Sequence, residues 1–183
     1  ILEAPFVIDE GPGLPKWRPV SYTKKCYGPS TMRLGIEKSR NLMTVRLAQT
    51  VGIEKIVKYA RKFNILDISP LGLSVSLGAV ETSLLRLTNA YAMLVNGGKE
   101  IKPTLVDRIQ DRHGKTVFKH DNRVCPGCQW EFWTNQPVPK IPDIRATLTD
   151  RSSAFQMVSM LKGAIERGTG RSISDLGKPL AGK

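Results

Sequence analysis

The spacing of apolar residues predicts three helices in the first third of the chain. Residues 1–30 are rich in Pro and Gly and are typical of extended loop. Helical spacing begins at 31–38, resumes at 42–52 and continues over 53–65. The apolar face of the last segment consists of Ile53, Ile56, Val57 and Ala60. Its charged residues fall on the opposite face, so this helix is expected on the surface of a core.

The middle of the chain contains a less regular apolar segment and then a strong helical pattern. Residues 68–79 are apolar but interrupted by Gly and Ser, which favours loop and strand over helix. Residues 81–98 predict a helix that begins near Thr82 or Ser83 and ends at two glycines. The expected core stripe of this helix is Leu84, Leu87, Tyr91 and Leu94.

The last third predicts a hairpin, a long loop, a helix and a strand. Residues 104–120 alternate on both sides of a His-Gly turn, as a β-hairpin does. Residues 121–149 have no period and are interpreted as a loop insertion. A helix capped by Asp150 is predicted over 150–168, and residues 178–183 are typical of the start of a strand. The fold class is therefore mixed α+β, without the regular βαβ alternation of a parallel sheet.

Length and composition suit a soluble domain that is part of a larger protein. The chain has 183 residues, 40% of them hydrophobic and 24% charged, and no apolar run long enough to cross a membrane. It does not begin with Met, and we expect it to be a fragment. The net charge is +12, but the basic residues are scattered and do not alternate with aromatic residues. We therefore expect a solvated basic surface and no nucleic-acid partner.

Two of the three cysteines form a CxxC pair, Cys125 and Cys128, whereas Cys26 has no evident partner. A zinc site needs four ligands, and the spacing to His113 and His120 fits no standard finger. The surrounding loop composition also argues against a thioredoxin-like motif. A short disulfide and a pair of reduced thiols both remain open, and the chain predicts no metal and no cofactor.

Three short features could carry chemistry. Ser39 and Asn41 stand two residues apart between two predicted helices, where one hydroxyl could relay a proton and one carboxamide could bind a peptide. The alternative is that either residue caps the helix that follows. The segment 166–172, ERGTGRS, is a helix end and turn and lacks the pattern of a phosphate-binding loop. Lys183 ends the chain after two small residues, and the alternative there is an exposed tail lysine.

The order and context of these features resemble the transpeptidase domain of class A penicillin-binding proteins. That family uses an S-x-x-K nucleophile, then an S-x-N loop, then a K-T-G strand. The resemblance covers nearly the whole chain and is weakest at 121–149. It is carried by four blocks: WRPVSYTKKCYGPSTMRLGIEKSRN, VRLAQTVGIEKIVKYARKFNI, SLGAVETSLLRLTNAYAMLVNGG, and MVSMLKGAIERGTGRS with the final AGK.

The resemblance implies a penicillin-binding, serine β-lactamase-like fold, an antiparallel sheet flanked by helices, that is incomplete here. Residues 1–183 would be part of one domain, with S-x-x-K before residue 1 and the rest of K-T-G after Lys183. The two S-x-x-K matches inside the chain, at Ser21 and Ser159, are interpreted as decoys. One lies in a loop close to Ser39, and the other lies in the helix of 150–168.

The resemblance also implies acyl transfer between peptidoglycan stem peptides, with β-lactams acylating the same serine. Ser39 would serve the proton relay, Asn41 would bind the donor peptide, and Lys183 would add positive potential near its carboxylate. The parent would be anchored with this domain on the outer face of the cytoplasmic membrane, would carry a glycosyltransferase domain, and would meet other cell-wall synthesis proteins. The fragment alone would be inactive. The alternative is a non-catalytic module that binds cell-wall polymer or a divisome partner.

Overall fold

The computed structural model describes residues 1–9, 11–13, 15–67, 72–128 and 130–183. It divides into two compact units, the first made of residues 1–99 and 147–183 and the second of residues 100–146. The described residues contain helices and two small antiparallel sheets, which confirms the mixed α+β class. None of the described helices combines the length and the apolar character that spanning a bilayer requires.

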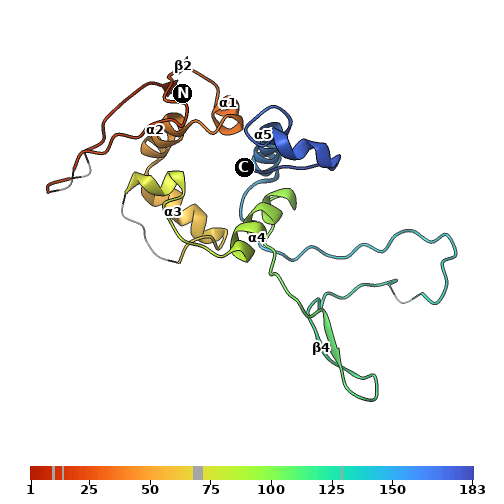
Figure 1. Ribbon diagram of the computed structural model, residues 1–183. Helices are drawn as coiled ribbons and strands as arrows, with labels where there is room; N and C mark the ends of the chain where they lie inside the picture. The colour runs from red at the N-terminus through yellow and green to blue at the C-terminus, as the bar shows by residue number, and fades with distance from the viewer. Residues whose placement is uncertain (10, 14, 68–71, 129) are drawn as a thin grey trace. The chain divides into compact units, whose positions relative to one another are not determined.

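The first unit begins with a short sheet and three consecutive helices. Strand β1 (Leu2–Glu3) pairs antiparallel with β2 (Gly28–Pro29). The helices α1 (Met32–Glu37), α2 (Asn41–Val51) and α3 (Ile53–Lys62) follow and confirm the three predicted helices. Helix α2 is the most deeply buried of the three, and Figure 1 shows it beside the N-terminal strands. Its buried residues are Leu42, Met43, Val45 and Ala48.

The two long helices of the first unit are capped as their sequences predict. Ser83 accepts a hydrogen bond from the backbone N–H of Arg86 and starts α4 (Leu84–Val95). Asp150 accepts one from Ser153 and starts α5 (Arg151–Glu166). These bonds satisfy N–H groups that the helix itself leaves unpaired. Helix α5 packs against both α1 and α4 (Figure 1), so it joins the two halves of the unit.

The predicted core stripe of α4 is wrong in its position. Leu84 is 82% exposed, and the residues that α4 buries are Asn89, Ala90 and Met93. Leu87, Tyr91 and Leu94 line an apolar cavity. Helical spacing identifies the apolar face of a helix, but the neighbouring helix decides which edge of that face is covered. Here α4 packs against α5 and buries Asn89, Ala90 and Met93 rather than Leu84.

Both strands predicted inside the first unit are absent from the described residues. Residues 73–77 of the segment 68–79 form a 3-10 helix, η1 (Leu73–Leu77), and residues 68–71 lie outside the described residues. Residues 178–183 follow a second 3-10 helix, η2 (Arg171–Leu176), and have no strand partner. A strand needs a neighbour to satisfy its backbone N–H and C=O groups. The composition of a single segment cannot show whether that neighbour exists.

The second unit is a hairpin followed by a loop. Strands β3 (Arg108–Gln110) and β4 (Thr116–Lys119) pair antiparallel, which confirms the predicted hairpin. The carboxylate of Asp111 accepts the backbone N–H groups of His113 and Lys115 and closes the turn. The described residues of 121–146 contain no helix or strand. They form a loop as expected, and its origin as an insertion stays a prediction.

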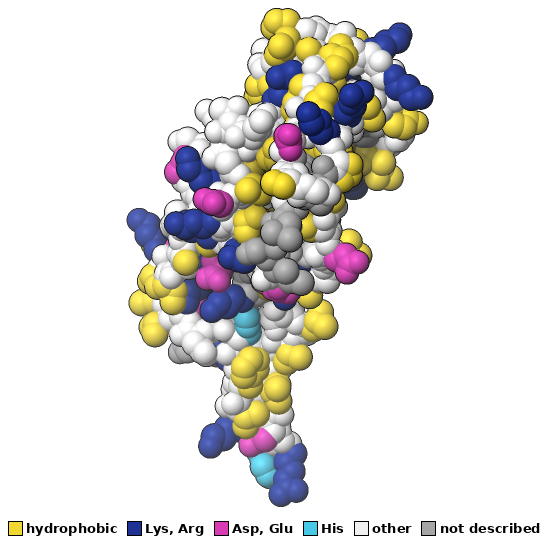
Figure 2. Space-filling model, turned by 90° about the vertical axis from the view of Figure 1, so that its left-hand side faces the viewer, with side chains coloured by type: hydrophobic (Ala, Val, Ile, Leu, Met, Phe, Trp, Pro, Cys, Tyr) yellow, Lys and Arg dark blue, Asp and Glu magenta, His cyan; other side chains and the backbone are white. Residues whose placement is uncertain are grey.

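Charged side chains are distributed over the surface in separate groups. On the face shown in Figure 2, Lys and Arg side chains appear in several separate groups among uncharged ones. Several acidic residues of the first unit pair directly with arginines, among them Glu3 with Arg40, Glu37 with Arg167, and Asp67 with Arg86. That this surface binds no nucleic acid stays a prediction.

The contact between α1 and the end of α5 predicts a large effect of one glycine. A Cβ atom at Gly168 would lie 2.1 Å from the backbone oxygen of Glu37. Because this neighbour is a backbone atom, relieving the clash would require the backbone itself to shift. We expect Gly168→Ala to lower the free energy of unfolding by about 1–3 kcal/mol. At Gly182 an added Cβ meets nothing within 4 Å. The control Gly182→Ala should therefore change stability by less than about 0.5 kcal/mol in urea unfolding, and equal effects of the two substitutions would contradict this packing.

Candidate functional site

The S-x-N loop, residues 39–41, is the turn that ends α1. The backbone N–H of Arg40 donates to the carbonyl of Gly35 at 2.9 Å, and that of Ser39 donates to Ile36 at 3.2 Å. This pair of bonds is the Schellman motif, in which the residue after the helix cap adopts a left-handed conformation. Ser39 occupies that position with φ of +52°.

Ser39 therefore stands where glycine is normally more stable. The left-handed conformation costs a residue with a Cβ atom about 1–2 kcal/mol, and glycine avoids most of that cost. Within the described part of the chain, the Ser39 hydroxyl has no hydrogen-bond partner that would offset the strain. A strained residue with a free hydroxyl is typical of a functional position.

Asn41 is the first residue of α2, and its side chain is held on one side. Its Nδ2 donates to the backbone carbonyl of Val20 at 3.1 Å. This bond leaves the Oδ1 oxygen without a partner among the described residues. The N-cap of α2 is Arg40, which makes no side-chain capping bond. The helix-cap alternative for Ser39 and Asn41 is therefore wrong, because neither side chain bonds the first turn of α2.

Glu37 anchors the loop from its N-terminal side. Its carboxylate is almost fully buried and lies 2.5 Å from Nη2 of Arg167 and 3.6 Å from Nη1 of Arg33. The hydrogen bond from Arg167 lowers the pKa of Glu37, although burial opposes that shift. The sequence suggested no such role, since a glutamate in a short helix is ordinarily a solvated residue.

Arg40 anchors the loop through β1. Its guanidinium lies 3.5 Å from the buried carboxylate of Glu3 and 3.6 Å from the centre of the Tyr27 ring. Ser21 donates a hydrogen bond of 3.0 Å to the same carboxylate. This bond argues against Ser21 as a nucleophile, because its hydroxyl is buried and already donates to Glu3. The hydrogen bond from Arg40 also lowers the pKa of Tyr27.

Lys183 lies on the segment that returns to α5. The backbone N–H of Gly182 donates to the carbonyl of Leu161 at 3.3 Å. The Lys183 side chain remains exposed, but nearby atoms remove part of its water and lower its pKa. No hydrogen bond or ion pair of the described residues joins Lys183 to Ser39 or Asn41. The structure thus joins two of the three predicted site residues in one loop and places the third on a neighbouring segment.

The second internal S-x-x-K match lies on α5 and is also committed to other contacts. Ser159 Oγ accepts a hydrogen bond from Arg33 at 3.2 Å. Lys162 forms an ion pair of 3.3 Å with Glu166, one helical turn further on. The serine and the lysine therefore face different partners, and this geometry is unlike that of a nucleophile with its base.

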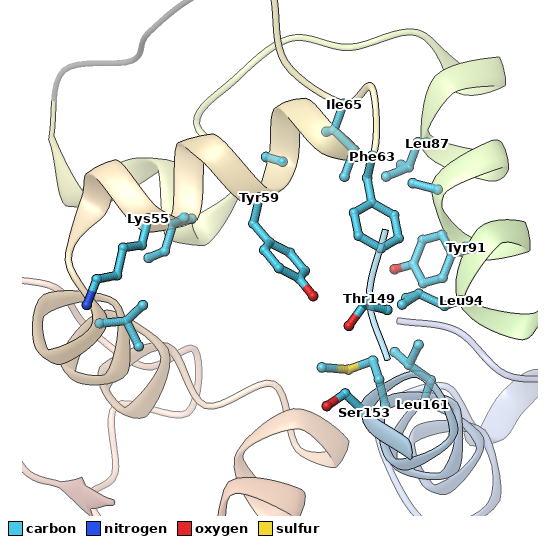
Figure 3. A pocket seen from close by; sticks show the side chains of 15 residues that line it. Lys55, Tyr59, Phe63, Ile65, Leu87, Tyr91, Leu94, Thr149, Ser153 and Leu161 are labelled. Atoms are coloured by element: carbon cyan, nitrogen blue, oxygen red, sulfur yellow. The ribbon is translucent and has the colours of Figure 1, made fainter. Parts of the chain in front are cut away.

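The first unit also contains a cavity of about 680 Å³ lined by α3, α4 and α5. Figure 3 shows aromatic and aliphatic side chains surrounding it, with the hydroxyl groups of Thr149 and Ser153 at one side. Its lining includes none of Ser39, Asn41 and Lys183. The residues with predicted chemistry and this apolar cavity are therefore separate features.

The second unit contains the cysteine pair. Cys125 and Cys128 are joined by a disulfide with Cα atoms 5.5 Å apart, and Cys26 is an exposed free thiol. The redox state of the pair in the cell stays a prediction. Among the described residues, no three His, Cys, Asp or Glu side chains gather in a group that could hold a metal.

Comparison with known proteins defines the class of this fold. The sequence model described as "Penicillin binding protein transpeptidase domain" matches residues 3–183. The structure is similar to penicillin-binding protein 1A from Haemophilus influenzae, with a TM-score of 0.73 and 25% identity over 93% of this chain and 27% of that chain. It also resembles the D,D-transpeptidase domain of a peptidoglycan glycosyltransferase from Eggerthella lenta in fold, with a TM-score of 0.62.

Relatives with similar sequences are also penicillin-binding proteins. Penicillin-binding protein 1A of Rickettsia bellii is 45% identical over 99% of this chain. The protein of the same name from Pseudomonas aeruginosa is 29% identical over 91% of it. The chain belongs to the penicillin-binding protein transpeptidase domain family. It spans 23% and 24% of the length of these two relatives, about a quarter in each case.

The strained backbone of Ser39 predicts a difference in stability between two substitutions of this residue. Ser39→Gly removes the hydroxyl and relieves the left-handed strain, whereas Ser39→Ala removes the hydroxyl and keeps the strain. We expect the glycine variant to be more stable than the alanine variant by about 1 kcal/mol. Urea unfolding measures the difference. An alanine variant as stable as the glycine variant would show that the backbone of residue 39 is not strained.

Proposed function

We propose that this chain is the central part of a peptidoglycan D,D-transpeptidase that works by serine acyl transfer. The nucleophile would be the serine of an S-x-x-K motif elsewhere in the full-length protein. The donor would be a stem peptide ending in D-Ala-D-Ala, and β-lactams would acylate the same serine. Membership of the family supports this proposal. The observation that carries it is Ser39, a serine with a free hydroxyl at a position that favours glycine.

Each site residue has a role that its surroundings support. Ser39 would pass a proton to the leaving amine, because its hydroxyl has no hydrogen-bond partner among the described residues. Asn41 would bind the backbone of the donor peptide through its Oδ1 oxygen, which would accept a peptide N–H, while the bond from Nδ2 to Val20 holds its orientation. Lys183 would add positive potential for the substrate carboxylate, and its charge would help to keep the lysine of S-x-x-K neutral.

The 183-residue chain alone would be inactive, since both S-x-x-K matches within it face other partners. The full-length protein would be anchored in the cytoplasmic membrane with this domain on the outer face, and would also carry a glycosyltransferase domain. Other proteins of cell-wall synthesis would be its partners. The second candidate is a non-catalytic module that binds cell-wall polymer or a divisome partner, which the match over residues 3–183 does not favour.

Acylation by a fluorescent penicillin tests the proposal. We expect the full-length protein to be labelled covalently, and Asn41→Ala to slow labelling at least tenfold because the ligand amide loses its partner. Asn64→Ala is a matched control, an asparagine beyond the end of α3 rather than in the S-x-N loop. It should label at the normal rate. An unlabelled wild-type protein that still binds peptidoglycan would favour the non-catalytic module, and normal labelling of Asn41→Ala would remove that residue from the site.

A further inference from the structure

The segment ERGTGRS, residues 166–172, contacts the end of α1 directly before the S-x-N loop. Arg167 presents its guanidinium to the carboxylate of Glu37, with Nη2 at 2.5 Å from Oε1 and Nε at 3.4 Å from Oε2. Two nitrogens of one guanidinium therefore face two oxygens of one carboxylate. This fork arrangement fixes the direction of both side chains as well as their distance.

Backbone atoms reinforce the contact on both sides of Glu37. The N–H of Thr169 donates to the Glu37 carbonyl at 3.1 Å, and the ammonium of Lys38 donates to the Arg167 carbonyl at 2.5 Å. The last residues of α1 are thus tied to the turn after α5 by one ion pair and two hydrogen bonds. Ser39 follows these residues immediately.

Two glycines make room for this contact. A Cβ atom at Gly163 would lie 2.0 Å from Oε1 of Glu37, and one at Gly168 would lie 2.1 Å from its backbone oxygen. Gly163 lies within the last turn of α5, and inside a helix glycine is less favourable than alanine by about 1 kcal/mol. The helix therefore contains a glycine where Glu37 needs space, and this arrangement accommodates the buried carboxylate specifically.

The same turn leads to the other candidate residue. After Thr169 the chain passes through η2 and returns to α5, where Gly182 bonds the carbonyl of Leu161. One end of the turn therefore holds the S-x-N loop, and the other continues to Lys183. A displacement of Arg167 relative to Glu37 would move Ser39 relative to the segment of Lys183.

We propose that Glu37 and Arg167 form a positioning pair that holds Ser39 and Asn41 in place relative to the segment that carries Lys183. The inference rests on the proposed transpeptidase function. Neither residue touches the reacting atoms in this role. They supply the restraint that keeps Ser39 in its left-handed conformation, which persists only where surrounding contacts determine it. Small displacements of reacting groups can slow a reaction by about a hundredfold.

A positioning role and a purely structural role are distinguished by the quantity that a substitution changes: the reaction rate of the folded protein or its stability. If the pair only stabilised the fold, a variant would lower the melting temperature and the yield, and every folded molecule would react normally. If the pair positions the loop, the folded molecules themselves react slowly. The acylation step must therefore be measured per acylatable molecule, with the end point of labelling used to count active sites.

The experiment uses the full-length protein and stopped-flow acylation by a fluorescent penicillin. It separates the dissociation constant of the first complex from the rate constant of acylation. The test variant is Glu37→Gln, which keeps the shape of the side chain and removes its charge. The matched control is Glu166→Gln, because Glu166 also pairs with Arg167, at 3.1 Å, but is half exposed, and its ion pairs among the described residues are with Lys162 and Arg167 rather than with α1.

We expect Glu37→Gln to lower the acylation rate constant at least tenfold and Glu166→Gln to change it less than twofold. Equal rate constants in wild type and Glu37→Gln, or equal losses in both variants, would overturn the positioning role. Arg167→Lys covers the case in which Glu37→Gln does not fold. It keeps the charge and loses the fork, so it should also slow acylation, and a normal rate constant would overturn the proposal. Failure of the proposed function appears separately, as a wild-type protein that is never acylated.

Discussion

The ion pair between Glu37 and Arg167 is the interaction on which the candidate site depends. Glu37 is buried, and a buried carboxylate without a partner destabilises a protein by several kcal/mol. The pair therefore acts as a restraint, because moving Arg167 away would leave the buried carboxylate with only the longer contact of 3.6 Å to Arg33. Since Arg167 follows α5 and Glu37 ends α1, the restraint joins two segments more than a hundred residues apart.

The S-x-N loop combines two kinds of local cost. Ser39 adopts a backbone conformation that favours glycine, and the loop is flanked by two buried carboxylates, Glu37 and Glu3. A strained serine backbone and a buried carboxylate are each unfavourable for folding. Such unfavourable features concentrate at functional sites. The two ion pairs, Glu37 with Arg167 and Arg40 with Glu3, hold the loop from opposite ends. Together they explain how a strained serine keeps a single conformation.

Helices with a strong apolar period could be predicted from the sequence, as α3 was, and those that also have a capping side chain, α4 and α5, could be predicted together with their start. The strands predicted at 68–79 and 178–183 were not found in the described residues, because pairing depends on a neighbour that no single segment reveals. The Ser39–Asn41 pair could be identified from its resemblance to a family motif. The roles of Glu37 and Arg167 could not, since a charged residue in sequence is ordinarily exposed and only tertiary contacts make it buried. Gly163 likewise has a reason only when Glu37 is placed against it.

A double-mutant cycle on acylation tests this account most directly. The rate constant of acylation would be measured in the full-length protein, in Glu37→Gln, in Arg167→Gln and in the double variant. If the two residues act as one restraint, the double variant should be no slower than the slower single variant, because either substitution already removes the pair. If the two single losses multiply in the double variant, Glu37 and Arg167 act independently, and the ion pair is not what holds the S-x-N loop.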